Sequence, residues 1–145
     1  MRIAVLSDTH DRLPEAVSRK LRDADEIWHL GDVCEPAIIH ELGALGPPLR
    51  VVAGNCDDHP WPPTLDLERA GVRFHLEHIP PARAPAGAQV VLHGHWHVPR
   101  DETDPAGVRW LSPGAISDPR GGSAAGFAWL TVEPKKPLGW QRVRV

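Results

Sequence analysis

The sequence contains no tyrosine, one methionine, two phenylalanines and only two cysteines in 145 residues. Two cysteines that form no CxxC pair cannot build the disulfide framework of a small secreted domain. No apolar run reaches the length of about 18 residues that a membrane-spanning helix needs. The formal net charge of −3 provides no excess of basic residues, so general nucleic-acid binding is not expected. An acid and a histidine come too early in MRIAVLSDTH for a signal peptide, and we expect a cytoplasmic protein.

Histidine, in contrast, is abundant, with nine residues in the chain. The length suits a single compact domain over residues 1–145, and no linker-like stretch divides it. The first third alternates short β-branched runs at 2–6, 26–30 and 49–53 with helical spacing at 14–24 and 35–45. This pattern predicts a β-α-β-α-β unit with right-handed crossovers and a parallel sheet.

The second half differs, because its apolar runs are separated by Pro and Gly clusters with little helical periodicity. We expect strands at 72–79, 89–93, 108–112, 125–132 and 138–145. The connecting segment PPARAPAGA (80–88) is too short and too rich in proline for a crossover helix. The sequence therefore favours antiparallel or irregular pairing across this segment.

The three runs of the first third each end in a small residue followed by a polar one, in VLSD, HLGD and VAGN. In open α/β sheets, ligands bind outside the carboxyl ends of the parallel strands, so Asp8, Asp32 and Asn55 should converge on one crevice. His10 lies two residues after Asp8 and can offer an imidazole nitrogen to the same ion. In HGHWH, His95 and His97 alternate on one side of an extended segment and can complete the site.

His78, at the end of RFHLEH, is the seventh candidate donor, and one ion cannot use seven such groups. Two divalent ions that share Asp32 as a bridge can use them and still keep open positions for water or substrate. Oxygen and nitrogen donors without thiolate indicate manganese first, with iron, nickel, cobalt or zinc as alternatives. The charges of two cations and two aspartates sum to about +2, which suits an anionic phosphoester.

The ordered set SDTH, GD, GNCD, H and GHWH resembles the calcineurin-like metallophosphoesterase superfamily, in particular its small YfcE-like phosphodiesterase branch. The resemblance extends from Arg2 to about Ile116 and includes SPGAI, which is similar to the NPGS turn of that family. It implies an α/β fold, a four-layer α/β/β/α sandwich of two mixed sheets flanked by helices. It also implies a homodimer or homotetramer.

The resemblance further implies the ligands of each metal and the chemistry. Attack of a metal-bridging hydroxide on phosphorus would hydrolyse a small phosphoester or nucleotide, and Asp57 would orient a ligand or a water. Asp32, Asn55, Asp57 and His78 are therefore the residues expected to act in catalysis. One metal is expected on Asp8, His10, Asp32 and His97, and the other on Asp32, Asn55, His78 and His95.

The sequence departs from the family pattern at three points. Cys56 stands where many members have the histidine of GNHD or GNHE, and a cysteine cannot replace that histidine as a general acid at neutral pH. Only 16 residues separate His78 from His95, where relatives usually insert a helix, so we expect a more open site. EHIP replaces the usual THGH, and His75 remains an alternative to His78 as a ligand.

Two further questions stay open at the level of the sequence. Cys34 and Cys56 follow two of the metal-binding strands and could form a redox-responsive pair, although two small, partly buried thiols are the simpler interpretation. The fold could also serve as a binding scaffold with little catalysis, as in the metallophosphoesterase-like subunit of the retromer coat. Every ligand position carries a competent donor, which favours an enzyme.

Overall fold

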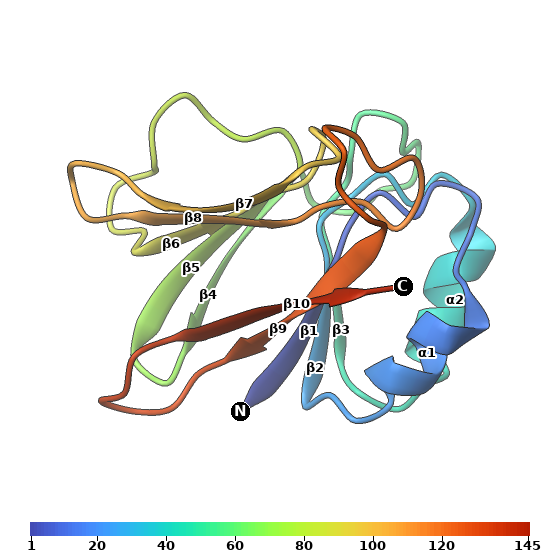
Figure 1. Ribbon diagram of the computed structural model, residues 1–145, viewed down its shortest axis with the longest axis horizontal. Coiled ribbons are helices and arrows are strands. Elements are labelled where there is room, and N and C mark those ends of the chain that lie inside the picture. Colours follow the sequence, from blue (N-terminus) through green and yellow to red (C-terminus); the bar gives the residue numbers. More distant parts are fainter.

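The computed structural model describes all residues, 1–145, as two five-stranded mixed β-sheets packed face to face, with two helices (Figure 1). The strand orders are β10-β9-β1-β2-β3 in the first sheet and β4-β5-β6-β8-β7 in the second. The predicted α/β class with two mixed sheets is confirmed.

The first sheet contains the β-α-β-α-β unit expected from the first third of the chain. Strands β1 (Arg2–Leu6), β2 (Glu26–His29) and β3 (Leu49–Val51) are parallel, and helices α1 (Glu15–Leu21) and α2 (Pro36–Gly43) connect them. The last two strands of the chain, β9 (Gly126–Thr131) and β10 (Gly139–Arg144), extend this sheet in antiparallel pairing beside β1.

The second sheet consists of β4 (Thr64–Arg69), β5 (Val72–Glu77), β6 (Val90–Leu92), β7 (Pro99–Thr103) and β8 (Arg109–Pro113). Strands β5, β6 and β8 are parallel, while β4 and β7 pair antiparallel at its two edges. These two edge strands were not expected from the sequence, because TLDLER and PRDET carry too many charged residues to read as half-buried strands. Charged side chains are typical of exposed edges.

The expectation of antiparallel or irregular pairing across residues 80–88 was wrong. β5 and β6 are parallel, with Phe74 opposite Val90 and Leu76 opposite Leu92. A crossover helix is not needed, because β6 has only three residues and an extended, proline-rich segment can return to the start of so short a strand. This segment arches on the outer side of the second sheet (Figure 1).

Two apolar clusters hold these layers together. The larger lies between the sheets and includes Val5, Trp28, Phe74, Leu92 and Leu111, all less than 2 % exposed. The second joins both helices to the outer face of the first sheet. The layers are therefore helix, sheet and sheet, three rather than the four expected. The fourth layer is missing because the connection from β5 to β6 is the short, proline-rich segment 80–88 and not a helix.

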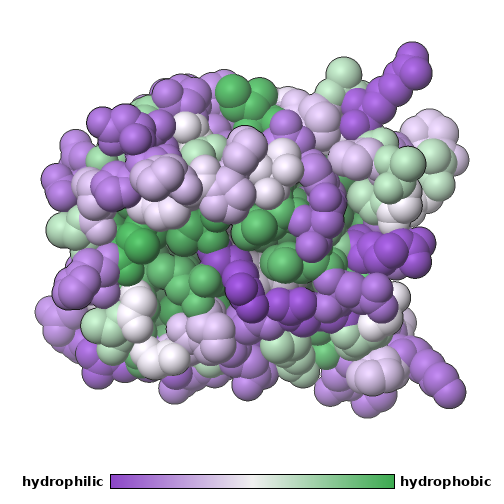
Figure 2. Space-filling view, turned by 180° about the vertical axis from the view of Figure 1, so that it is seen from behind, coloured by the Kyte–Doolittle hydropathy of each residue, from purple (hydrophilic) through white to green (hydrophobic).

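The outer surface carries both hydrophobic and polar residues. Figure 2 shows hydrophobic residues gathered across the middle of one face, with polar residues around them. None of the helices is long and apolar enough to cross a membrane. Trp61 is half-buried against the cluster under the helices.

Candidate metal centre

Seven side chains singled out in the sequence gather where the two sheets meet, each just beyond the carboxyl end of a parallel strand. Strands β1, β2 and β3 come from the first sheet, and β5 and β6 from the second. Because parallel strands end on the same side of a sheet, residues far apart in sequence meet here. The residues are Asp8 and His10 after β1, Asp32 after β2, Asn55 after β3, His78 after β5, and His95 and His97 after β6.

The first group of potential ligands contains Asp8, His10, Asp32 and His97, whose ligand atoms lie within 4.8 Å of one another. His97 Nε2 is 3.1 Å from Asp8 Oδ1 and 3.4 Å from His10 Nε2. His10 Nε2 lies 4.0 Å from Asp32 Oδ2. Four donors that point at one another in this way can surround a single cation.

The second group contains Asp32, His78 and His95, whose ligand atoms also lie within 4.8 Å of one another. His78 Nε2 lies 3.3 Å from Asp32 Oδ2, and the Asn55 side-chain oxygen lies 3.0 Å from His95 Nδ1. Asp32 thus belongs to both groups. Its Oδ2 faces His10 on one side and His78 on the other, as a bridging carboxylate would.

Two polar atoms at this centre are buried without a hydrogen-bond partner: Asp8 Oδ1 and His78 Nε2. Buried polar groups are nearly always paired, so each such exception calls for an explanation. The other polar atom of each side chain has a hydrogen-bond partner. Asp8 Oδ2 accepts from the Ser7 hydroxyl at 2.6 Å, and His78 Nδ1 contacts the Leu30 carbonyl oxygen at 2.7 Å.

The backbone contacts of the imidazoles fix which nitrogen faces the centre. His78 Nδ1 donates to the Leu30 carbonyl, and His97 Nδ1 donates to the Asp118 carbonyl at 2.7 Å. A neutral ring that donates from Nδ1 has its lone pair on Nε2, so both Nε2 lone pairs face carboxylate oxygens. Lone pairs in this arrangement repel unless a cation or a proton lies between them. The donor set and its orphaned atoms therefore fit a divalent metal.

The backbone at the centre is unusual, because five of the seven residues have positive φ. The φ angles are 54° at Asp8, 49° at His10, 55° at Asp32, 70° at His95 and 58° at His97. Non-glycine residues seldom adopt this conformation, and it costs of order 1–3 kcal/mol each at strained sites. Such a concentration is characteristic of functional centres. Sequence reasoning could not reveal it.

Asp57 contacts the backbone of the loops rather than the group of ligands. Its carboxylate accepts from the backbone N–H groups of Asp32 at 2.9 Å, Cys34 at 2.8 Å and Gly54 at 2.7 Å. It therefore joins the loops after β2 and β3. Burial raises the pKa of Asp32, but a hydrogen bond from His78 when its Nε2 carries a proton, together with the Cys56 backbone N–H, outweighs burial and lowers this pKa to about 2. Asp32 is accordingly a carboxylate at neutral pH.

Three of the remaining histidines are buried outside the group of ligands. His75, the alternative ligand, lies on the outer face of the second sheet between Asp66 and Glu77, each 2.8 Å away, so it is not part of the centre. His29 and His93 are fully buried, and burial lowers the pKa of His29 to about 3 and that of His93 to about 4.

Sequence reasoning missed several residues that support the centre. His29 contacts the Thr9 hydroxyl at 3.0 Å and accepts from the Gly31 N–H, and so holds the loop between Asp8 and His10. Ser7 supports Asp8. The SPGAI turn reaches the same loop, because the N–H of Ile116 donates to the Ser7 carbonyl and that of Ser117 to the Asp8 carbonyl. No motif signals such contacts, which depend on backbone groups.

The interpretation of the two cysteines as small, partly buried thiols was wrong. Cys34 and Cys56 are not free thiols but form a disulfide between the loops after β2 and β3. The parallel course of β2 and β3 places these loops side by side, which explains the proximity of residues 22 positions apart. Cys56 is exposed and Cys34 half-buried.

Residues 1–135 match the family profile described as calcineurin-like phosphoesterase superfamily domain. The chain belongs to this superfamily. A "Probable metallophosphoesterase" from Methanothermobacter thermautotrophicus is 36% identical over 142 residues, which cover 83% of this chain and 80% of the relative. The family binds divalent metals, and the gathered His and Asp side chains are candidate sites for them.

Solved structures agree with this assignment. YfcE, a phosphoesterase from E. coli, superposes with a TM-score of 0.79 at 26% identity, covering 90% of this chain and 88% of that one. Vps29 of Entamoeba histolytica, in a complex with zinc, has a TM-score of 0.78 at 17% identity and covers 99% of this chain and 98% of its own. The second likeness shows the fold alone.

Proposed function

We propose that this protein is a metal-dependent phosphodiesterase that hydrolyses a small phosphoester or nucleotide at a two-metal centre. The observation that carries the proposal is the pair of buried, unpartnered atoms, Asp8 Oδ1 and His78 Nε2, which lie 3.8 Å apart, with His78 Nε2 3.3 Å from Oδ2 of the shared Asp32. A retired site would have no reason to keep such costly groups buried.

The two groups of side chains support the ligand assignment, with Asn55 added to the second through its contact with His95. Asp8, His10, Asp32 and His97 would hold one divalent ion, and Asp32, Asn55, His78 and His95 the other. When bound, the two ions would supply Lewis acidity toward the phosphoryl oxygens and an activated water. Manganese is the ion we expect, because the donors are oxygen and imidazole nitrogen without thiolate.

The residues of the chain contribute position and charge. The low pKa of Asp32 keeps it negative, so it can bridge two cations at neutral pH. The backbone carbonyls of Leu30 and Asp118 keep His78 and His97 in the tautomer that presents Nε2 to the centre. Asp57 orients the Asp32 and Asn55 loops through three backbone N–H groups and acts as a positioning residue.

Position 56 supports a phosphoester whose leaving group departs without protonation over one with a poor leaving group. The sulfur of Cys56 is bonded to Cys34 and cannot donate a proton to the leaving oxygen. A substrate whose leaving group departs without protonation, such as an aryl or activated diester, needs no such acid.

The test compares hydrolysis of bis-p-nitrophenyl phosphate with that of p-nitrophenyl phosphate, on protein stripped by a chelator and refilled with manganese. We expect faster diester cleavage and about two metals per chain by elemental analysis. Asp8→Asn should lower both metal content and rate, the rate by on the order of 100-fold or more, because it neutralises a ligand.

Asp23→Asn is the matched control, since Asp23 is an exposed carboxylate outside the centre, and it should behave as wild type. Full diesterase activity in Asp8→Asn would contradict the proposal. Two bound metals without turnover of either ester would instead indicate a scaffold, the role that we considered as the alternative from the sequence.

A further inference from the structure

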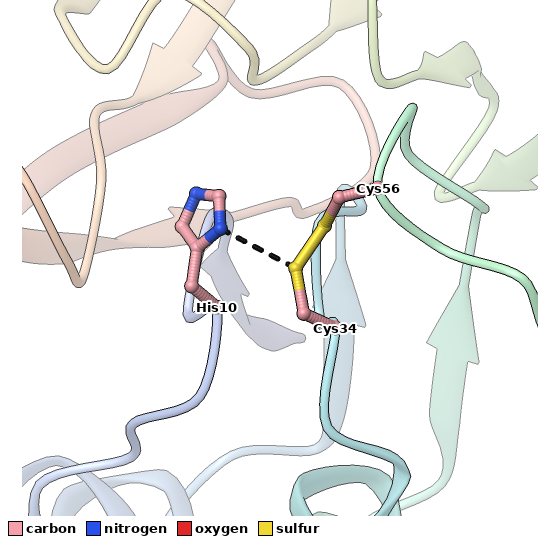
Figure 3. A group of neighbouring side chains, drawn as sticks. All are labelled: His10, Cys34 and Cys56. Carbon is pink, nitrogen blue, oxygen red and sulfur yellow. Dashed lines mark hydrogen bonds between the residues drawn. A yellow bond between two sulfur atoms is a disulfide. The ribbon is translucent and has the colours of Figure 1, made fainter.

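The Cys34–Cys56 disulfide lies directly against a candidate metal ligand. Figure 3 shows the His10 ring beside the bond, with its Nδ1 facing Cys34 Sγ at 3.3 Å. The opposite ring nitrogen, Nε2, faces Asp8, Asp32 and His97. The His10 imidazole therefore lies between the disulfide and the oxygen and nitrogen donors of the candidate metal centre.

The disulfide is not needed to keep its two loops together. The Cys34 N–H donates to Asp57 at 2.8 Å, and the Cys56 N–H donates to Asp32 at 3.0 Å. Both backbones thus remain held if the sulfur–sulfur bond is cut, and their Cα atoms are 5.8 Å apart. Because Cys56 is exposed, a small thiol reductant can reach the bond.

We propose that reduction of this disulfide creates a separate metal site formed by Cys34, Cys56 and His10, selective for a soft divalent cation of the zinc class. The ligand atoms of these three residues lie within 4.8 Å of one another. Two thiolate ligands favour zinc-like ions, whereas the neighbouring centre is thiolate-free, with carboxylate, amide and imidazole donors, and is the one expected to hold manganese.

The chemistry balances with a dithiol as the reductant. The dithiol supplies two electrons and leaves as its own cyclic disulfide, and each cysteine sulfur gains a proton. A divalent cation then displaces these two protons and binds two thiolates and the His10 Nδ1. A water can fill the fourth position of a tetrahedral site.

The geometry is close to what such an ion requires. Bond lengths of about 2.3 Å to sulfur and about 2.0 Å to nitrogen place tetrahedral zinc ligands roughly 3.5–3.8 Å apart. The His10 Nδ1 to Cys34 Sγ distance of 3.3 Å is near this value. Once the sulfurs are no longer bonded, side-chain rotation alone can bring Cys56 to the same ion.

The site would make metal binding depend on the redox state. In the oxidised protein, His10 is available only to the thiolate-free centre. In the reduced protein, a soft cation on the thiolates takes up His10 Nδ1 and competes with that centre for the ring. The sulfur site itself does not depend on the proposed hydrolysis.

The test is a cobalt titration of the whole protein before and after treatment with a dithiol. Cobalt bound by thiolate has an intense near-ultraviolet charge-transfer band that carboxylate and imidazole ligands do not produce. We expect this band, with one additional cobalt per chain, only in the reduced protein. Zinc should displace the cobalt and abolish the band.

Variants test the contribution of the thiolates and of His10 separately. Cys34→Ser/Cys56→Ser should lack the band under both conditions and should still bind cobalt at the thiolate-free centre. His10→Ala should keep a thiolate band but weaken cobalt binding to the thiolates by at least about tenfold, as loss of a ligand requires.

Alkylation followed by measurement of the intact mass checks whether Cys34 and Cys56 form a disulfide before the dithiol is added. If both cysteines are modified without reductant, the pair is not a disulfide and the redox dependence is overturned. The sulfur site is overturned if protein whose two cysteines can be alkylated after reduction shows no charge-transfer band with cobalt. Either failure leaves intact the cobalt binding at the thiolate-free centre and the diester hydrolysis by protein not treated with the dithiol, so it is distinct from failure of the phosphodiesterase proposal.

Discussion

Gly94 shows how tightly single residues are packed around the centre. An added Cβ would overlap the Ser7 hydroxyl and lie only 2.7 Å from Asp8 Oδ2. Ser7 and Asp8 are hydrogen-bonded to each other, so neither can move without disturbing the other. The glycine between His93 and His95 is therefore required by space rather than by its backbone angles.

We predict that Gly94→Ala destabilises the protein by about 1–3 kcal/mol, the usual cost of overpacking a buried site, and lowers its metal content. Urea unfolding and elemental analysis measure the two effects. Gly43→Ala is the control, because a Cβ there meets nothing within 4 Å, and in helix α2 it should be neutral or stabilise by up to about 1 kcal/mol. Equal effects from both substitutions would contradict this view of Gly94.

At the scale of elements, β5 shows how alternation sorts histidines into different roles. Phe74 and Leu76 point into the core between the sheets, whereas His75 points outward to Asp66 and Glu77. His78 follows the end of the strand and is released from this alternation, which lets it turn toward Asp8 and Asp32. Three residues of separation thus decide between a buried ring paired with carboxylates on the outer face of the sheet and a candidate metal ligand.

The charge of His75 should make stability depend on pH. Burial lowers the pKa of His75, but the bonds to Glu77 and Asp66 outweigh it and raise this pKa above its ordinary value. A group with a raised pKa stabilises the folded state fully below its unfolded pKa of about 6.5, and this contribution disappears as the pH rises through the folded pKa.

We therefore expect His75→Gln to destabilise the protein most in mildly acidic solution, with a difference from wild type that shrinks in alkaline solution. Urea unfolding across this pH range measures the effect. His40→Gln, at an exposed position in α2, is the control and should show no such trend. A His75→Gln penalty independent of pH would show that the ring acts by packing alone.

For the whole molecule, the most important feature is that the candidate centre spans both sheets. Asp8, Asp32 and Asn55 follow strands of the first sheet, while His78 and His95 follow strands of the second. Bound metals would therefore connect the two sheets at this end of the sandwich, where a negatively charged carboxylate pair is otherwise buried among imidazoles.

Metal loading should consequently raise thermal stability. At manganese about 100-fold above its dissociation constant, one site stabilises the folded state by about 2.7 kcal/mol, which corresponds to a rise in Tm of roughly 5–10 °C for a chain of this size. Calorimetry of chelated and refilled protein measures the shift. In His97→Ala most of the shift should vanish; a shift of wild-type size would mean that the metal stabilises the fold elsewhere.

The sequence by itself determined the parallel core of the first sheet and the identity of the gathered donors. Apolar runs that end in VLSD, HLGD and VAGN imply both, because the strand and the polar residue at its end are local features of the chain. Membership of the superfamily was visible for the same reason.

Only the tertiary structure decided the rest. The choice of His78 over His75, the disulfide between Cys34 and Cys56, and the parallel return from β5 to β6 all depend on which segments lie side by side. The positive φ angles of the donors and the backbone carbonyls that orient their rings are likewise set by contacts between distant segments. Such contacts leave no periodic trace in the sequence, since they involve backbone groups that every residue carries.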